Sequence, residues 1–489
     1  MTRAVSQVCR FRLTAQPGPI ILEVLWSQAD LGAALLAETH FMLKIRRIDW
    51  GDLDARIHLD TLRNSLSVED GQVTEASQQR TIEVFGEPLS PLSVVRRIID
   101  EVRLRGDEAV AKYCEKLDGA KIEPGHFRLD PSRFKASWEG VDEDFRNALR
   151  LAASNIEKFQ RMLVKDGSTV LERDGVRLES VVRPLRRVGV YIPGGAAAYP
   201  SAVLMDVIPA QVAGCREIAV ATPAGKLNDH VMAAFHLLGL DEVYSVGGAT
   251  AVAMLAYGTE SVPAVDMIVG AGNTFVNLAK REVCGAVKID MFAGPSEILV
   301  IADDTADCDL AAADLLSQAE HYPGSAILVT TSQALAEEIV ECIERQLVEL
   351  PRRDMCRESL ERYGAIVKVS DIHEAVEVAN LVAPEHLEIM TRAPREIAAR
   401  IENAGTVFVG SDTPEAAGDY VAGSSHTLPT GGTARFAEGL SALDFQKRMS
   451  IIEYSRQALQ RELPAILSLA GHEGLDAHAR AAARRFEKD

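Results

Sequence analysis

The stretch EILVIADDTADCDLAAADLLSQAEHYPGSAILVTT (297–331) indicates the fold class of this chain. It begins and ends with a short apolar run, EILVIADD (297–304) and AILVTT (326–331), and the segment between them has apolar residues at helical spacing. A short apolar run bounded by turn residues is typical of a strand that is buried in a parallel sheet. The order strand, helix, strand therefore predicts a βαβ unit.

Seven further apolar runs of this kind lie on either side of that stretch, with helical segments between them. They are VGVYIP (188–193), EIAVATP (217–223), EVYSVGG (242–248), MIVGAG (267–272), AIVKVS (365–370), LEIMT (387–391) and TVFVG (406–410). Nine such runs are too many for one small sheet. We therefore expect an α/β fold with two doubly wound, Rossmann-like parallel-sheet domains and helical extensions at both ends.

The remainder of the chain is mainly helical in pattern. Apolar residues recur at helical spacing over 90–117, with a break at Gly106, and again over 142–165, 446–463 and 475–487. Residues 1–41 are interpreted as a poorly ordered extension or a mis-called start. The predicted domain ranges are 42–186 (helical, joining the first α/β domain), 187–295 (second α/β domain), 296–440 (first domain continued) and 441–489 (helical tail).

Composition excludes several classes of protein. The chain has 489 residues, 47% of them hydrophobic, which is enough to bury a core. Its formal charge of −19 disfavours nucleic acid as a partner, and no apolar run approaches the roughly 18 residues of a membrane span. The seven cysteines are scattered without a CxxC motif, a pattern that favours reduced thiols and a cytoplasmic location.

Two pairs of polar residues are candidates for chemistry. Gln318 and His321 are three positions apart at the end of a predicted helix, so both side chains can face one metal ion, although they can equally bond to each other. Glu385 and His386 follow Pro384 between a helix and a strand, at an edge where open α/β sheets bind ligands. Histidine is a natural general base near neutral pH, but an exposed turn is the alternative.

Three weaker signals accompany these pairs. The polar segment 413–436, with Asp419 and His426, either binds a ligand or is disordered. The stretch GAGNTF (270–275) lacks the third glycine of a dinucleotide fingerprint, yet it still allows a cofactor contact near Asn273. The C-terminal His472, Glu473 and His478 by themselves indicate only a solvated surface.

Taken together, these segments resemble the histidinol dehydrogenase family from about Pro91 to the C-terminus. The matching stretches are RVGVYIPGG (187–195), LAYGTESVPAVDMIVGAGN (255–273), IDMFAGPSE (289–297), LLSQAEH (315–321), APEHL (383–387), DTPEAAGDY (412–420), SSHTLPTGGTARF (424–436) and GLSALDFQKRMSIIEYS (439–455). The chain departs from the family with Thr250 in GGATA, GAGN for GPGN and MFAGP for MPAGP, which bears on cofactor affinity more than on reaction type.

The resemblance implies a homodimer with shared active sites and a residue set for each role. Glu385 and His386 would be the acid–base pair. One zinc ion per subunit would be held by Gln318, His321, Asp419 and His478, with the last histidine from the partner subunit's tail. L-Histidinol would contact these four residues and His386, together with Ser296, His426 and Glu473. NAD would contact Tyr191, Thr250 and Asn273.

The expected activity is the NAD-linked, zinc-dependent four-electron oxidation of L-histidinol to L-histidine through L-histidinal, the last step of histidine biosynthesis. Three alternative functions are compatible with parts of this pattern. A relative could oxidise another small polar alcohol, such as a dihydroxypropane sulfonate. A zinc hydrolase could use Glu385 without a dinucleotide, and a binding protein would have little reason to keep a base, a carboxylate and four metal ligands.

Overall fold

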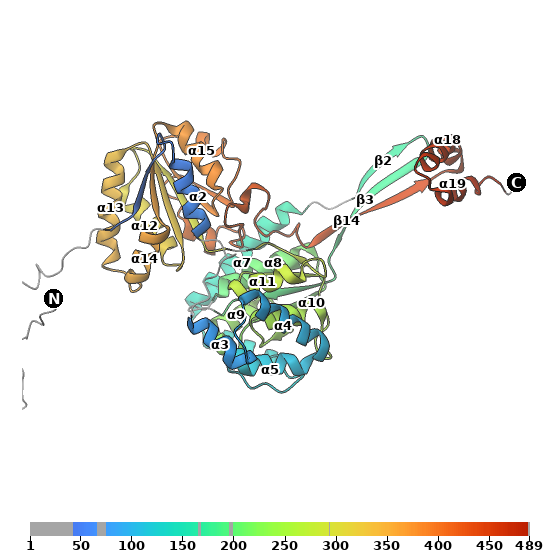
Figure 1. Cartoon of the computed structure of the whole chain (residues 1–489), viewed down its shortest axis with the longest axis horizontal. Coiled ribbons are helices and arrows are strands. Elements are labelled where there is room, and N and C mark those ends of the chain that lie inside the picture. The colour runs from blue at the N-terminus through green and yellow to red at the C-terminus, as the bar shows by residue number, and fades with distance from the viewer. Residues whose placement is uncertain (1–42, 66–74, 165–167, 195–198, 293, 488–489) are drawn as a thin grey trace, which may run out of the picture. The chain divides into compact units, whose positions relative to one another are not determined.

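The computed structural model describes residues 43–65, 75–164, 168–194, 199–292 and 294–487 (Figure 1). The predicted extension over 1–41 lies outside the described residues. Within the described part, two parallel sheets and one antiparallel sheet are present. The two doubly wound parallel-sheet domains expected from the sequence are confirmed, and all nine apolar runs contribute a strand.

The first parallel sheet has six strands in the order β1-β11-β10-β9-β12-β13. Their bounds are β1 Arg46–Asp49, β9 Glu297–Ala302, β10 Ser325–Thr330, β11 Ala365–Lys368, β12 His386–Met390 and β13 Thr406–Val409. The two central strands of the quoted stretch, β9 and β10, pair in parallel along their whole length, and α12 (Cys308–Ala319) connects them. This is the predicted βαβ unit.

Alternate residues of these strands pack on opposite faces of the sheet. Ile298 and Val300 of β9 join the core beneath α12, α13 (Gln333–Leu347) and α14 (Arg353–Tyr363). Leu299 and Ile301 join the core beneath α2 (Ala55–Ser65), α15 (Ile372–Val382) and α16 (Pro394–Ala398). Since both faces are covered, the strands are continuously apolar, as the sequence showed.

The second parallel sheet has five strands in the order β6-β5-β4-β7-β8. The bounds are β4 Arg187–Tyr191, β5 Glu217–Ala221, β6 Val243–Tyr244, β7 Met267–Val269 and β8 Lys288–Ile289. The first strand, β4, lies in the middle, so the strand order reverses between β4 and β7. Such a switch point is where doubly wound sheets bind nucleotides.

The helices of this second domain include most of the N-terminal part of the chain. One face is covered by α6 (Pro131–Gly140), α7 (Glu143–Leu163), α8 (Pro200–Ala213) and α9 (Asp229–Leu237). The other is covered by α4 (Pro91–Arg105), α5 (Asp107–Asp118), α10 (Gly248–Tyr257) and α11 (Thr274–Val283), with Phe85 of α3 (Glu75–Phe85) beside them.

This packing differs from the predicted range 42–186, which was joined to the first domain. Among the described elements of that range, only β1 lies in the six-stranded sheet and only α2 packs on it. Helix α4 packs on α10 and α11, α6 packs on α9, and α7 packs on α8. Helical periodicity shows that an apolar face exists but not which sheet will cover it.

The third sheet is antiparallel, in the order β14-β3-β2, with β2 Thr169–Arg173, β3 Val176–Pro184 and β14 Gln446–Tyr454. Helices α18 (Arg456–His472) and α19 (Asp476–Ala483) follow β14 and lie next to these strands in Figure 1. An ion pair between Arg173 and Glu462 joins β2 to α18. We call this sheet and its two helices the C-terminal arm.

The arm corrects the prediction of a helix over 446–463. Residues 446–454 form a strand that pairs with β3 over nine positions, and Ser455 then caps α18. Met449 and Ile452 are three positions apart, which matches a helix by chance, whereas Ile451, Ile452 and Tyr454 favour a strand. Among the described helices, none is long and apolar enough to cross a membrane.

Candidate active site

His386 is the first residue of β12, where it lies beside Ile298 of β9 and Thr406 of β13. Helix α15 ends at Val382, and its C-cap Ala383, three residues before His386, has a left-handed φ of 50°. Ligands of open α/β sheets usually bind at the carboxyl ends of strands. Here the predicted acid–base pair is instead at the amino end of β12, so the sheet rule did not place it correctly.

The backbone of Glu297, at the start of β9, orients both members of the predicted pair. The Glu297 N–H donates to Glu385 Oε2 at 2.9 Å. The Glu297 carbonyl accepts from His386 Nδ1 at 3.2 Å, which leaves the imidazole Nε2 as the basic atom. This Nε2 is buried without a hydrogen-bond partner among the described residues and lies 3.7 Å from Asp419 Oδ1.

Helix α17 (Glu415–Tyr420) brings two carboxylates to His386. Glu415 and Asp419 are four positions apart and therefore share one side of the helix. Glu415 Oε1 is 3.4 Å from His386 Nδ1, and Ser317 of α12 donates to Glu415 Oε2 at 3.0 Å. Ligand atoms of His386, Glu415 and Asp419 all lie within 4.8 Å of one another.

Gln318, in the last turn of α12, is buried near this cluster. Its side chain is 0% exposed, yet neither its Oε1 nor its Nε2 has a hydrogen-bond partner among the described residues. Leaving an amide buried without partners is costly, so this pair of atoms is suited to binding a ligand. His321 lies two residues beyond the helix end and is exposed. The alternative that the two side chains bond to each other is not what the structure shows.

Burial dominates the electrostatics of the cluster. It raises the pKa of Asp419 to about 6 and, with the charge of Asp419, that of Glu415 to about 8. It lowers the pKa of His386 to about 3 and that of His426 to about 4, with further contributions from neighbouring imidazoles. The pKa of Glu385 is also raised well above its usual value by burial and nearby carboxylates. Such a site favours a bound cation, which would stabilise the ionised carboxylates.

Two further predicted substrate residues lie on segments that lead to this cluster. Ser296 directly precedes β9, and its carbonyl accepts from Ser325 of β10 at 2.9 Å. His426 Nδ1 is 3.1 Å from the Asp419 carbonyl. The next residue, Thr427, donates to Asp206 of α8 at 2.6 Å, so the polar segment 413–436 is ordered and is tied to the second domain.

The structure does not bring the C-terminal pair to the same place. Glu473 follows α18, and His478 is in α19; both are exposed. No contact between either side chain and the His386 cluster occurs among the described residues. Within one chain, the predicted ligand set therefore lacks its fourth member.

The predicted cofactor residues lie at the carboxyl end of the five-stranded sheet. Tyr191 ends β4, and its hydroxyl accepts from the Gly248 N–H at the start of α10, at 3.1 Å. Asn273 caps α11 through its Oδ1, next to the switch point between β4 and β7. Thr250 is 2% exposed within α10, so little of its side chain is accessible to a ligand.

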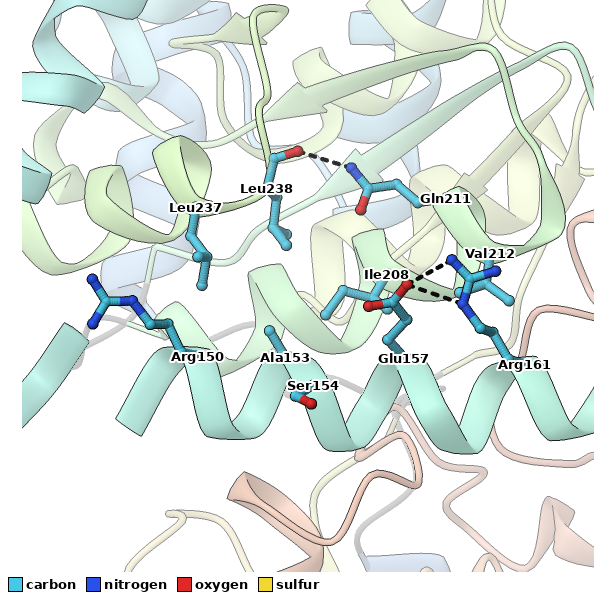
Figure 2. A pocket seen from close by; sticks show the side chains of 10 residues that line it. All are labelled: Arg150, Ala153, Ser154, Glu157, Arg161, Ile208, Gln211, Val212, Leu237 and Leu238. Atoms are coloured by element: carbon cyan, nitrogen blue, oxygen red, sulfur yellow. Dashed lines mark hydrogen bonds and ion pairs between the residues drawn. The ribbon is translucent and has the colours of Figure 1, made fainter. Parts of the chain in front are cut away.

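A separate cavity of about 440 Å³ lies among α7, α8 and the end of α9 (Figure 2). Polar groups that line it already have partners: Arg161 donates to Glu157, and Gln211 donates to the Leu238 carbonyl. None of the predicted site residues lines this cavity.

Sequence reasoning missed two residues of the cluster. Glu415 was quoted within DTPEAAGDY but was not singled out, although its spacing from Asp419 would have placed both on one helical face. Glu297 was missed because its contribution to the pair is made by the backbone, and its own carboxylate accepts from the Gly431 N–H at 3.0 Å. No sequence pattern reports a backbone contact of this kind.

A buried imidazole with a free nitrogen, adjacent carboxylates and a nucleotide-type switch point define a two-domain α/β enzyme of the dehydrogenase class. Comparison with known proteins identifies the family. The family model described as histidinol dehydrogenase matches residues 89–486, and the chain belongs to this family.

Similar proteins cover nearly the same length. The chain is 45% identical over 432 residues to histidinol dehydrogenase of Rhodopirellula baltica, covering 88% of this chain and 94% of that one. It is 48% identical over 416 residues to histidinol dehydrogenase of Geobacillus kaustophilus, covering 84% and 97%. The crystal structure of histidinol dehydrogenase from Elizabethkingia anophelis matches with a TM-score of 0.80 at 33% identity, covering 91% of this chain and 98% of that one.

Proposed function

We propose that this protein oxidises L-histidinol to L-histidine through L-histidinal, with NAD as the hydride acceptor and one zinc ion per subunit. The observation that carries the proposal is the buried His386 Nε2, unpartnered and aimed at Asp419, in a chain of the histidinol dehydrogenase family. The alternative is that the protein oxidises another small polar alcohol, but the comparisons do not favour this substrate.

The described residues fit a zinc site. The orphaned amide of Gln318 lies with His321 at the end of α12, and the Asp419 carboxylate faces the same cluster. Nitrogen and oxygen ligands without thiolate are acceptable to zinc. When bound, zinc supplies a Lewis acid that holds the imidazole and amine of the substrate. We assign Gln318, His321, Asp419 and the partner's His478 as its ligands.

His386 would act as the general base of both oxidation steps. Its Nδ1–H is held by the Glu297 carbonyl, so Nε2 is fixed as the acceptor for the substrate's hydroxyl proton. Burial lowers the pKa of His386 to about 3, so the imidazole is neutral before reaction. It would take a second proton from the hydrate of the aldehyde.

Glu385 would prepare that hydrate. Its carboxylate is anchored by the Glu297 N–H, and it is 6% exposed, so it can accept a proton from one water molecule in a protected site. Its raised pKa makes it a stronger base than an exposed glutamate once it is ionised. The cluster of described residues His386, Glu415 and Asp419 contains no cysteine, so we infer a hydrate and not a thiohemiacetal.

The five-stranded sheet would bind NAD at its switch point. Tyr191 ends β4 and Asn273 caps α11 after β7, on either side of this point, and a helix N-terminus stabilises phosphate groups. When bound, NAD accepts a hydride from the carbinol carbon. Because Thr250 is buried, we expect it to shape the site mainly through packing.

We further propose a homodimer in which the arm of one subunit completes the site of the other. Substrate-contacting Glu473 and zinc-binding His478 would come from the partner. Exposed apolar side chains gather on the arm and support burial against another surface: Val170, Leu171, Met449, Ile451, Ile452, Leu467, Leu469 and Leu475.

The decisive experiment measures NADH formed per L-histidinol by zinc-loaded protein, with limiting substrate and excess NAD. Two hydride transfers predict about two NADH per substrate, with histidine as the product. One NADH with accumulated aldehyde would contradict the second step. If the protein forms no NADH from histidinol but forms NADH from a sulfonated diol, the proposed substrate is wrong, although the fold is unaffected.

A further inference from the structure

Two cysteines that the proposed reaction does not use lie against each other on the six-stranded domain. Cys308 is the first residue of α12 and Cys342 is in α13, and these helices pack side by side (Figure 1). Their Sγ atoms are 3.1 Å apart, with Cys342 donating to Cys308. No other pair of cysteines among the described residues has its sulfur atoms in contact.

The two thiols have different surroundings. Cys308 is partly exposed, whereas Cys342 is 3% exposed within the core beneath α12 and α13. Burial, together with the hydrogen bond to Cys308, raises the pKa of Cys342 to about 12, so Cys342 keeps its proton and donates it. Cys308 is therefore the more accessible of the two sulfurs and the one that a small oxidant reaches first.

A metal ion is the competing occupant, since Cys308, Asp309 and Cys342 offer ligand atoms within 4.8 Å of one another. Arg345 argues against it. Its guanidinium forms an ion pair with Asp309 and also donates to Cys342 Sγ at 3.3 Å. A cation would have to displace this charge, whereas a bond between the two sulfurs leaves the ion pair intact.

We propose that Cys308 and Cys342 form a reversible disulfide that ties α12 to α13. With a small disulfide such as oxidised glutathione as oxidant, the Cys308 thiolate attacks one of its sulfurs and one glutathione leaves as a thiolate. The Cys342 sulfur then attacks Cys308 Sγ and releases the second glutathione, which takes the Cys342 proton. Two protein thiols are oxidised, and one small disulfide is reduced to two thiols.

The link would act at the far end of α12 from the active site. Gln318 is ten positions after Cys308, about 15 Å along the helix. The disulfide therefore leaves the proposed ligands in place and closes a loop of the chain between the two helices. Closing such a loop restricts the unfolded chain, so the oxidised protein should unfold at a higher temperature with unchanged turnover.

Peptide mapping of the full-length protein tests the proposal. After equilibration with oxidised glutathione and alkylation, a glutamate-specific protease should be used, because trypsin leaves both cysteines in one peptide, 289–345. We expect peptides containing Cys308 and Cys342 to be joined and to separate after reduction. Cys284→Ser, which removes an exposed cysteine elsewhere, should give the same map.

Thermal unfolding supplies the second readout. The oxidised protein should show a midpoint several degrees above the reduced protein, and Cys308→Ser should abolish this difference. Alkylation of both cysteines after oxidation, or glutathione retained on Cys308, would overturn the proposal. If Cys308 and Cys342 are joined but the midpoint of thermal unfolding does not change, the disulfide does not stabilise the packing of α12 on α13. Mapping the unmodified chain decides the matter even where a serine variant folds poorly.

Discussion

At the scale of single residues, the site depends on which nitrogen of His386 is free. The Glu297 carbonyl holds Nδ1 and leaves Nε2 unpartnered toward Asp419. The neighbouring Gln318 has neither amide atom satisfied. These two observations assign different roles to two buried residues of the same domain: His386 is the proposed base, and Gln318 is a proposed metal ligand.

This separation gives a first prediction. His386→Ala should lower kcat by about 10²–10⁴-fold, because a general base contributes about that much, while zinc content stays unchanged. His321→Ala should instead lose the metal. Steady-state kinetics with elemental analysis of the purified variants measures both effects. Full zinc in His321→Ala would remove this residue from the ligand set.

Asp206 gives a second prediction, on stability. It is 1% exposed and accepts from Thr427, and burial raises the pKa of Asp206 to about 7, against about 4 in an unfolded chain. Between these values the folded protein binds more protons, so Asp206 makes stability fall as pH rises from about 4 to 7.

Asp206→Asn keeps an acceptor for Thr427 and cannot ionise. It should therefore stabilise the protein by roughly 1–3 kcal/mol at pH 8, with a smaller gain at pH 5. Urea unfolding at the two pH values measures this difference, with the exposed Asp144→Asn as control. An equal gain at both values would mean that Asp206 is not the titrating group.

At the scale of elements, α17 must lie close to β13 for its carboxylates to reach His386. Gly418 makes this possible, because a Cβ there would come within 2.6 Å of the Phe408 ring. The same ring has its centroid 5.9 Å from that of His386. The Phe408 ring of β13 therefore lies against both Gly418 of α17 and the imidazole of His386.

Gly418→Ala should consequently displace either α17 or Phe408. We expect a loss of about 1–3 kcal/mol of stability from overpacking, together with weaker zinc binding, because Asp419 is the next residue. Zinc titration and thermal unfolding should be compared with Ala416→Ser, an exposed position on the same helix. Unchanged zinc affinity in Gly418→Ala would show that α17 tolerates the extra methyl group.

At the scale of the whole molecule, one chain does not bring together all the residues proposed for the site. Glu473 and His478 are exposed on the arm, and the arm carries apolar side chains on its surface. The proposed dimer explains both features. A two-fold dimer would exchange the arms reciprocally, so each site would combine His386 of one subunit with the partner's His478.

Subunit mixing tests this arrangement. His386→Ala and His478→Ala should each be almost inactive alone. After equal amounts are unfolded and refolded together, half of the dimers are mixed and one of their two sites is intact, so about a quarter of the wild-type activity should return. No recovery from dimers shown to be mixed would place His386 and His478 in the same subunit's site.

Nine of the eleven strands in the two parallel sheets, the βαβ order and the helix break at Gly106 could be read from the sequence alone, because these features depend on local periodicity. It also contained an unused signal: Asp174 and Gly175 both have positive φ and form the tight turn between β2 and β3. The resemblance supplied the residues now proposed for catalysis and metal binding.

Contacts between groups far apart in the sequence depend on how the chain folds in three dimensions. Glu297 and Glu385 are 88 positions apart, and their contact exists because β9 and β12 are neighbours in the sheet. The location of the cluster at the amino end of β12, the packing of 91–163 on the second domain and the contact of Cys308 with Cys342 have the same origin. Local periodicity specifies an element and its apolar face, but the partner of that face is selected by packing over the whole chain.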